Sequence, residues 1–478
     1  MFKTEDIINQ LTFKNLLVES DVDQISFEDL QYNSNSVTRN DTLFVVKGNI
    51  KDQYILDAVK KGATAIVTTV RKEISIPQII VKDEQKTLAA LSALFFNNPQ
   101  ENLEIIGITG TKGKTSTSYI LYSLLFNLLG KENVALFSTI ETKIGADISY
   151  KSHLTTPESY DLFSNMAKAV DAGVKYLVME VSSQAYLKNR VFGLTFDVGI
   201  FLNISEDHVG QNEHPTFEDY LEKKVELSKN SRVMLVNGDD FYKDQFLGNA
   251  QKDVVISSDE YQTLASNLSH SVFEFENHKY ELLIPGDFNV LNAIFALKTI
   301  EILGLCFSQE LIPIENIPGR MLKIQTQDHG IVFVDYAHNY DSLKHLMLFL
   351  KTRLEPKGKI IIVLGSTGNK GQNRREGFGK AISEFADVAI LSSDDPGFED
   401  PKMIADEIKA NITNTKVKVD YIEDRKEAIK FAIDSASKED LVVLAAKGED
   451  LYQKINGVDT PYQGDYQIAE QYVKDGKL

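Results

Sequence analysis

The 478-residue chain has a single cysteine, Cys306, and therefore cannot form an internal disulfide framework or a cysteine-rich zinc site. It also lacks any run of about 18 consecutive apolar residues, which a membrane-spanning helix needs. Its first residues, MFKTEDIINQLTF, carry charge too early for the apolar stretch of a secretory signal. We therefore predict a cytoplasmic protein that does not insert into a membrane.

The chain has fewer basic than acidic residues. The chain has 51 Lys and Arg against 69 Asp and Glu, for a formal net charge of -18. Nucleic acid as a main partner is disfavoured, because neutralising a phosphate backbone requires a clustered basic surface. Tracts of low complexity and repeats of about 20 to 50 residues are absent as well. Any phosphate that the protein binds must be held by a local arrangement.

The composition, with 43% hydrophobic and 25% charged residues, is that of a globular protein. Since a single core stops growing at about 250 to 300 residues, a chain of this length indicates several domains. A polar stretch with Pro99, NNPQENL, is typical of a linker after the first of them. We predict three α/β domains, over residues 1–102, 103–317 and 318–478.

Short β-branched runs alternate with helical stretches through most of the chain. In the first domain, residues 42–70 have a strand–helix–strand pattern, and Gly62 is placed to end the helix. From residue 104 to 205 the alternation predicts a central parallel sheet flanked by helices. After the IPGR segment at 317–320 it repeats, which predicts a second, doubly wound Rossmann-like sheet.

The strongest local motif is EIIGITGTKGKTS, in which a hydrophobic strand enters a glycine-rich turn and a helix begins at Lys114. In a P-loop, backbone N–H groups approach phosphate oxygens, the lysine reaches the outer phosphates and the following hydroxyl holds Mg²⁺. Ile108 stands where the general pattern has its first glycine, and an ordinary strand–turn–helix is the alternative. The predicted nucleotide-binding residues are Gly110, Thr111, Lys112, Gly113, Lys114 and Thr115.

GITGTKGKT resembles the nucleotide loop of the Mur ligase superfamily, which also contains the folylpolyglutamate synthases. The blocks MEVSS, LNISEDHVGQNEH, NGDD, PGDFNVLNA, PGRM and VDYAH follow in the order found in that superfamily. LTTPES, the arginine at 190, DDPGFEDP and KGEDLYQ resemble the branch that extends UDP-MurNAc-L-Ala-D-Glu. The resemblance implies an ATP-dependent acid–amino-acid ligase of peptidoglycan synthesis, which activates a carboxylate as an acyl phosphate and requires two Mg²⁺ ions.

Three residues are expected to organise the metal and phosphate chemistry. Glu180 ends an apolar strand, where open α/β sheets place ligand-binding groups, and its carboxylate suits Mg²⁺; capping a neighbouring helix is the alternative. His208 resembles the histidine that helps bind the second Mg²⁺ in the family. Lys224 aligns with the lysine that is carbamylated there, although Lys223 beside it leaves the register open. With Lys114, these are the expected catalytic residues.

The resemblance also implies ligands for the nucleotide and for the muramoyl substrate. Asn289 and Asn292, one helical turn apart, are expected to meet adenine, and Arg320 and Asp335 to reach phosphate and ribose. Where related ligases often carry DSR for the uridine end, this chain reads NSNSV, so that its candidates are two serines. The predicted substrate-binding residues are Ser34, Ser36, Thr155, Thr156, Ser182, Ser183, Arg190, Arg375, Asp394, Asp395, Gly397, Glu449 and Asp450.

The incoming amino acid is predicted from the segment DDPG. Family members that use meso-diaminopimelate carry DNPR, whose arginine can clamp the extra carboxylate, whereas Gly397 stands at that position here. Asp395, with Glu449 and Asp450, favours a cationic side-chain tip, and we predict L-lysine. L-ornithine, one methylene shorter, and meso-diaminopimelate are the alternatives.

A folylpolyglutamate-synthase-like ligase is the nearest rival function, opposed by the full-length N-terminal domain and by DDPG. A P-loop switch protein without ligase chemistry is the rival from another class. The predicted partners are ATP, Mg²⁺, UDP-MurNAc-L-Ala-D-Glu and L-lysine, bound by a monomer.

Overall fold

The computed structural model describes residues 1–48, 50–206, 214–369 and 371–476. His208 therefore lies outside the described residues. The chain forms two compact units: residues 1–259 with 294–307, and residues 260–293 with 308–478. None of the described helices is long and apolar enough to cross a membrane.

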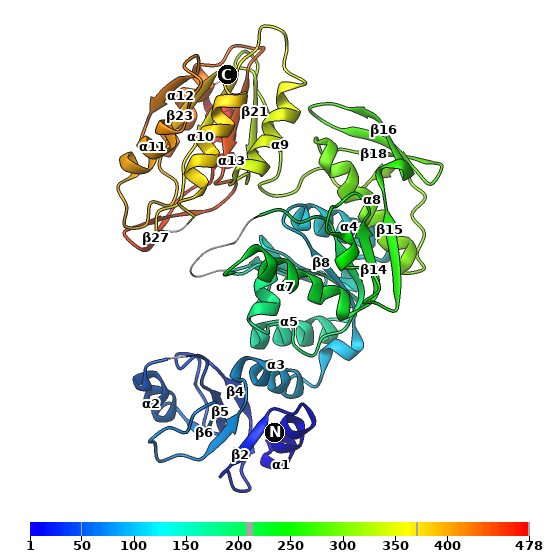
Figure 1. Ribbon diagram of the computed structural model, residues 1–478, viewed down its shortest axis with the longest axis vertical. Helices are drawn as coiled ribbons and strands as arrows, with labels where there is room; N and C mark the ends of the chain where they lie inside the picture. The colour runs from blue at the N-terminus through cyan, green and yellow to red at the C-terminus, as the bar shows by residue number, and fades with distance from the viewer. Residues whose placement is uncertain (49, 207–213, 370, 477–478) are drawn as a thin grey trace. The chain divides into compact units, whose positions relative to one another are not determined.

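The N-terminal part of the first unit is a sheet in the order β2-β7-β6-β5-β4, with β2 antiparallel to β7 and the other pairs parallel (Figure 1). The predicted strand–helix–strand pattern is confirmed, and Gly62 follows its helix with φ 122°, where a Cβ would lie 2.3 Å from the Arg39 carbonyl oxygen. The elements are α1 Thr4–Phe13, β2 Leu17–Ser20, β4 Asp29–Gln31, β5 Thr42–Val45, α2 Asp52–Lys60, β6 Ala63–Thr68, β7 Gln78–Val81 and α3 Glu84–Phe95.

The central sheet of the first unit has the order β11-β10-β9-β12-β8-β13-β14-β15. Its strands are parallel except for β10 and β11, a hairpin at one edge that the sequence pattern did not predict. The elements are β8 Glu104–Thr109, α4 Lys114–Leu129, β9 Val134–Phe137, β10 Glu141–Ile144, β11 Ile148–Lys151, α5 Ser159–Asp171, β12 Tyr176–Glu180, α6 Ser183–Leu187, β13 Phe196–Phe201, α7 Phe217–Lys229, β14 Ser231–Asn237 and β15 Lys252–Ile256.

The second unit contains two larger sheets. One has the order β16-β17-β18-β19 and was not predicted; the other has the order β20-β21-β25-β22-β23-β24 and is parallel except for β20, as the doubly wound prediction requires. The elements of the first are β16 Tyr261–Ser266, β17 Ser271–Phe275, β18 His278–Leu282 and β19 Leu311–Ile312, and α8 Asp287–Ile302 belongs to both units.

The doubly wound sheet is built from β20 Leu322–Gln325, β21 Ile331–Asp335, α9 Tyr340–Lys351, β22 Ile360–Leu364, α10 Arg374–Phe385, β23 Val388–Leu391, α11 Pro401–Ala410, β24 Lys418–Tyr421, α12 Arg425–Asp434, β25 Leu441–Ala445 and α13 Asp465–Gly476. A small hairpin, β26 Tyr452–Ile455 with β27 Val458–Pro461, follows β25. Every residue of β22 and β25 is buried, as expected for central parallel strands covered on both faces.

Each parallel sheet gathers polar residues at the carboxyl ends of its strands. In the first unit, the phosphate loop follows β8 and Glu180 ends β12, which pairs with β8 through Glu180 and Ile108. In the second unit, Asp335 ends β21 while Asp394 and Lys447 follow β23 and β25. Ligands of open α/β sheets bind at this edge, so the candidate site lies here.

Candidate active site

The phosphate loop joins β8 to α4. Gly113 is the residue before the helix and has φ 85°, a left-handed conformation that glycine adopts without a steric penalty. The Lys114 ammonium folds back over the loop and donates to the carbonyl oxygens of Gly110 at 2.7 Å and Thr111 at 3.2 Å. A helix N-terminus with a lysine bound across the loop is a ready site for anionic phosphate.

Asn203, which follows β13, fixes the shape of the loop. Its carbonyl and side-chain oxygens accept from the backbone N–H groups of Thr111 and Lys112, each at 2.9 Å, and its amide donates to the Lys112 carbonyl at 3.1 Å. The Thr111 hydroxyl meets the Tyr220 hydroxyl at 3.1 Å. Asn203 belongs to the LNIS motif, from which we predicted no role for it. Its hydrogen bonds to Thr111 and Lys112 show that it stabilises the conformation of the loop.

Glu180 is fully buried beside the start of α4. One carboxylate oxygen accepts from the Thr115 hydroxyl at 3.0 Å and from the Thr139 N–H at 2.9 Å; the other accepts from the Thr139 hydroxyl at 3.0 Å. These donors are all neutral, and no ion pair of Glu180 occurs within the described ranges of the chain. A buried carboxylate without a cation is costly, and a hard cation bound by oxygen ligands fits this pair of side chains.

Lys224 lies on the buried face of α7, with 2% of its surface exposed. Its ammonium donates to the Gly110 carbonyl oxygen at 2.8 Å and lies 4.7 Å from the centre of the Tyr220 ring. Lys223 is only half-buried, so the residue that faces the loop is Lys224. Lys114 and Lys224 thus bind the same carbonyl oxygen, and two ammonium groups this close favour an anion beside them.

His214 is a second histidine of the LNISEDHVGQNEH segment, and it is fully buried. Its Nδ1 lies 2.6 Å from Asp219 and its Nε2 lies 2.8 Å from the Ser183 hydroxyl. Ser183, predicted to bind substrate, therefore contacts His214, which precedes α7 and is paired with Asp219 on that helix. No cluster of three or more His, Cys, Asp and Glu side chains that could hold a metal occurs among the described residues.

The predicted muramoyl-peptide residues of the first unit lie together after β12. The Thr156 hydroxyl donates to the Glu180 carbonyl oxygen at 2.9 Å and accepts from the Ser182 N–H at 3.1 Å. Thr155 accepts from the Thr139 hydroxyl at 3.1 Å. These contacts connect the predicted substrate residues directly to Glu180, so that a carboxylate held by them would lie near the phosphate loop.

Arg190 joins this group through Glu158. Its guanidinium donates to Glu158 Oε1 at 2.8 and 3.1 Å and to the Thr156 carbonyl oxygen at 3.3 Å. Lys47, which follows β5, is bound to the other oxygen of Glu158. Burial by itself would raise the pKa of the Glu158 carboxyl, but the hydrogen bond from Lys47 and the charge of Arg190 together lower it.

The two serines proposed for the uridine end differ in exposure. Ser34 is buried and its carbonyl oxygen accepts from Lys61 at 3.0 Å, whereas Ser36 is exposed and its N–H donates to the Asn33 carbonyl oxygen at 2.9 Å. The segment is thus a turn whose exposed hydroxyl belongs to Ser36.

In the second unit, Asp335 is buried and hydrogen-bonded to the segment before β20. It accepts from the N–H groups of Met321 at 2.9 Å and Ala337 at 2.8 Å. Burial raises the pKa of the Asp335 carboxyl, and the nearby Arg320 opposes that shift. Asn289 and Asn292 are both buried on α8 and hydrogen-bonded to each other at 3.1 Å, as their spacing predicts.

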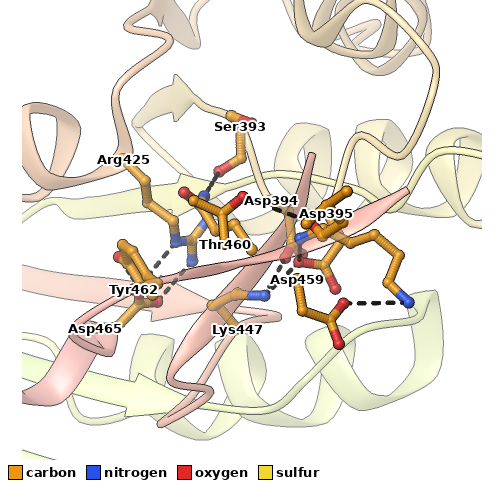
Figure 2. Close-up of polar contacts among 12 residues, drawn as sticks. Ser393, Asp394, Asp395, Arg425, Lys447, Asp459, Thr460, Tyr462 and Asp465 are labelled. Atoms are coloured by element: carbon orange, nitrogen blue, oxygen red, sulfur yellow. Dashed lines mark hydrogen bonds and ion pairs between the residues drawn. The ribbon is translucent and has the colours of Figure 1, made fainter. Parts of the chain in front are cut away.

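The aspartates of the DDPG segment form an ion cluster with Lys447, which we did not predict from the sequence. Figure 2 shows the Lys447 side chain directed at Asp394 and Asp395; its ammonium lies 2.6 Å from Asp395 Oδ1 and 3.4 Å from Asp394 Oδ1. Beside it, the fully buried Arg425 and Asp465 pair at 2.6 Å. Burial raises the pKa of the Asp394 carboxyl, and the charge of Lys447 opposes that rise. Lys447 had been visible only as the first residue of KGED.

The remaining predicted residues have partners within the second unit. Arg375 is buried and ion-paired with Glu399 at 2.8 Å and Glu407 at 2.6 Å. Glu449 accepts from Gln467 at 3.2 Å. Asp450 is hydrogen-bonded to Tyr336. Gly397 follows the two aspartates after Pro396, and its N–H donates to the Lys454 carbonyl oxygen at 2.9 Å.

Comparison with known proteins identifies two family models in this chain. The Mur ligase middle domain matches residues 108–300, and the Mur ligase, glutamate ligase domain matches residues 319–448. A UDP-N-acetylmuramyl-tripeptide synthetase of Ligilactobacillus salivarius (strain UCC118) is 46% identical over 487 residues, covering 95% of each chain. A UDP-N-acetylmuramoyl-L-alanyl-D-glutamate--L-lysine ligase of Enterococcus faecalis (strain ATCC 700802 / V583) is 42% identical over 466 residues, covering 93% of this chain and 91% of its own.

Among solved structures, that of a UDP-N-acetylmuramoyl-L-alanyl-D-glutamate--2,6-diaminopimelate ligase matches with a TM-score of 0.64. The two chains are 24% identical, and the match covers 96% of this chain and 98% of the other. At this identity the likeness bears on the fold alone. It confirms the predicted α/β fold class with N-terminal, middle and C-terminal domains, while the exact domain boundaries stay predictions.

Proposed function

The chain belongs to the Mur ligase family, and we propose that it is the ATP-dependent ligase that joins L-lysine to the D-glutamate γ-carboxylate of UDP-MurNAc-L-Ala-D-Glu. The main support for the proposal is the arrangement of the phosphate loop. Lys114 and Lys224 both donate to its Gly110 carbonyl oxygen, and the buried Glu180 accepts from Thr115 at its end. The names of two relatives that are more than 40% identical support the tripeptide product. The family members are ligases, which sets aside the P-loop switch as an alternative.

The reaction needs two steps because a carboxylate is a poor electrophile. A γ-carboxylate oxygen attacks the terminal phosphorus of ATP, the bond from phosphorus to the bridging oxygen breaks, and ADP leaves. The amine then attacks the carbonyl carbon of the acyl phosphate, the C–N bond forms, and inorganic phosphate leaves while the amine loses a proton. Lys114 and the N–H groups of the loop bind the phosphates and offset their charge in both steps.

Mg²⁺ is assigned to Thr115 and Glu180, whose adjacent oxygens fit a hard cation. When bound there, the ion would supply charge neutralisation for the transferring phosphoryl group. A carbamate on Lys224 would turn one of the two ammonium groups near Gly110 into an anion, as a second Mg²⁺ requires. His208 stays a proposed ligand of that second ion and lies outside the described residues.

The muramoyl dipeptide is assigned to the residues that follow β12. Thr155, Thr156, Ser182 and Arg190 lie within one connected network that includes Glu180. Ser183, which contacts His214, is also proposed to bind the dipeptide. The uridine end is assigned to Ser34 and Ser36. Asn289, Asn292, Arg320 and Asp335 are the proposed nucleotide ligands of the second unit. Arg375, with both of its ion pairs internal, is proposed to shape the amino-acid pocket.

L-lysine is favoured over the alternatives by the charges near Gly397. The acidic residues Asp394, Asp395, Glu449 and Asp450 suit an ammonium tip, and no arginine follows Pro396 to bind a second carboxylate. The lysine ligase of Enterococcus faecalis supports this choice. L-ornithine differs by one methylene, worth about 1 to 3 kcal/mol of discrimination, and is the runner-up.

ADP release measured with a panel of amino acids tests the proposal. With UDP-MurNAc-L-Ala-D-Glu present, we expect release to depend on L-lysine and to be much slower with L-ornithine or meso-diaminopimelate. Equal rates with meso-diaminopimelate would overturn the assignment of lysine. Release that is indifferent to both the dipeptide and the amino acid would overturn the ligase itself.

A further inference from the structure

Lys447 is a buried cation with a specific set of contacts. Only 1% of its side chain is exposed, and its ammonium lies between Asp394 and Asp395 and 5.2 Å from the centre of the Tyr452 ring. A flexible lysine is seldom buried unless it is paired, since both desolvation and lost rotamer freedom oppose it. The close pair with Asp395 therefore identifies a defined site for the ammonium rather than a surface charge.

The backbone on both sides of Lys447 has an unusual conformation. Ala446 has φ 77° and Gly448 has φ 58°, so the lysine lies between two left-handed residues. For a non-glycine residue such as Ala446 this conformation is strained and persists only where the surroundings impose it. A Cβ on Gly448 would lie 2.4 Å from the Tyr336 ring, which fixes the turn from the other side.

The two carboxylate oxygens of Asp395 differ in their hydrogen bonds. Oδ1 accepts from the Lys447 ammonium at 2.6 Å and from the Lys454 N–H at 3.0 Å, and the Asp395 carbonyl oxygen accepts from the Gly368 N–H at 2.8 Å. Within the described part of the chain, Oδ2 accepts no hydrogen bond, and 15% of the side chain is exposed. The carboxylate is therefore oriented through Oδ1, and its side chain is partly exposed.

We propose that Lys447 is a positioning residue that holds Oδ1 of Asp395, so that Oδ2 is presented to the cationic tip of the incoming amino acid. This inference rests on the proposed function, because it concerns how the lysine side chain is recognised. The two aspartates and Lys447 leave one uncompensated negative charge, and the neighbouring Arg425–Asp465 pair is neutral. The site thus stays attractive to an ammonium even though it contains one of its own.

Removing Lys447 separates this role from a simple charge effect. If only the summed charge mattered, loss of the cation would leave the site more negative and would lower the KM for L-lysine. If Lys447 orients Asp395, its loss frees the carboxylate to turn, and the KM rises instead. The two accounts predict changes of opposite sign in the same measurement.

The experiment compares Lys447→Met, which keeps the length of the side chain, with Lys418→Met as the matched control. Lys418 is largely exposed and pairs with the half-buried Asp420 in the same sheet, and ion pairs near the surface contribute little. For Lys447→Met we expect a rise of about tenfold or more in the KM for L-lysine, with the KM for ATP and kcat at saturating lysine nearly unchanged. The control should match the parent protein in all three.

Lys447→Arg provides a second variant in case the methionine protein does not fold. A guanidinium can bind both oxygens of Asp395, so that Oδ2 is occupied and the KM for L-lysine rises although the charge is kept. An unchanged or lower KM in Lys447→Met, or an unchanged KM in Lys447→Arg, would overturn the inference. An unsubstituted protein without lysine-dependent ADP release would instead overturn the proposed function, so that the two failures are distinguishable.

Discussion

At the scale of single residues, the phosphate loop is organised by side chains that converge from three elements. Lys114 at the start of α4 and Lys224 on α7 bind the same Gly110 carbonyl oxygen, and Glu180 at the end of β12 accepts from Thr115 beside them. Two cations and one buried anion therefore lie around a loop of a few residues. Changing Lys224 and changing Glu180 have distinct expected results.

Changing Lys224→Ala should lower kcat by about 100-fold or more, because the anion proposed on this side chain could no longer form. Short carboxylates such as formate or acetate should restore part of the rate, since they supply an anion in the space left by the side chain. Steady-state ADP release with and without added carboxylate measures both effects. Lys223→Ala, one position away and only half-buried, is the control, and full activity of Lys224→Ala would end the assignment.

Glu180→Gln keeps the shape of the side chain and removes its charge. Without Mg²⁺ we expect the Tm to be equal to or higher than that of the parent protein, because a buried carboxylate without a cation is costly. Stabilisation by ADP that depends on Mg²⁺ should be lost, since the ion would lose an anionic ligand. Thermal unfolding with ADP, with and without Mg²⁺, provides the measurement. Undiminished Mg²⁺-dependent stabilisation would exclude Glu180 as a ligand.

The sequence predicted the positions of the site residues better than their partners. Strand-end positions follow from hydrophobic runs, so the sequence alone could place Glu180 at the carboxyl end of a strand. The partners depend on which strands become neighbours, and this is why Asn203, Thr139 and Lys447 were missed as contacts. Sequence spacing does not encode such long-range contacts.

At the scale of helices and strands, the prediction succeeded where the hydrophobic pattern was long and ended clearly. The helix predicted to begin at Lys114 is α4, Lys114–Leu129, with Gly113 and Gly130 at its two ends. The hairpin β10–β11 and the sheet β16–β19 were missed, because many of their residues are exposed and they lack continuous apolar runs. Exposed antiparallel strands give a weaker signal than buried parallel ones.

The buried Arg425–Asp465 pair connects the first residues of α12 and α13. Arg425 also donates to the Ala445 carbonyl oxygen at 2.7 Å, and Tyr462 donates to Asp465 at 2.7 Å. Changing Arg425→Leu leaves the aspartate buried without its cation and should cost about 3 to 5 kcal/mol of unfolding free energy.

Lys430→Met on the same helix is the control for this change. It removes a partly exposed pair with Glu427 and should cost no more than about 1 kcal/mol. Urea unfolding of the three full-length proteins compares these costs. Equal midpoints for the leucine variant and the control would show that the buried pair does not stabilise α12 and α13.

At the scale of the whole molecule, the chain forms two compact units, and contacts within the first unit connect its N-terminal part to its central part. Glu158 makes one of these connections, because Lys47 follows β5 of the first sheet and Arg190 belongs to the segment after α6. The proposed binding residues for UDP-MurNAc-L-Ala-D-Glu lie in both the N-terminal and the central part of this unit, so binding requires that the two parts keep a fixed arrangement. The stability of this connection is therefore expected to depend on the charge of Glu158.

The pKa of Glu158 is lowered in the folded protein, so this residue contributes stability above its unfolded pKa of about 4.3 and loses it as the pH falls through the folded value. Glu158→Gln should therefore be less stable than the parent protein by about 2 kcal/mol near neutral pH. The difference should close as the pH falls below about 4. Urea unfolding at a series of pH values tests this, and a gap that is constant at all pH values would contradict it.

Oxygen transfer from substrate to phosphate tests the central claim most directly. UDP-MurNAc-L-Ala-D-Glu labelled with ¹⁸O at the γ-carboxylate is turned over with ATP and L-lysine in unlabelled water, and the released phosphate is analysed by mass. If the carboxylate attacks the phosphorus and the amine then displaces phosphate, each phosphate carries one ¹⁸O atom. Phosphate without ¹⁸O would mean that water attacked the nucleotide, and the ligase account would be wrong.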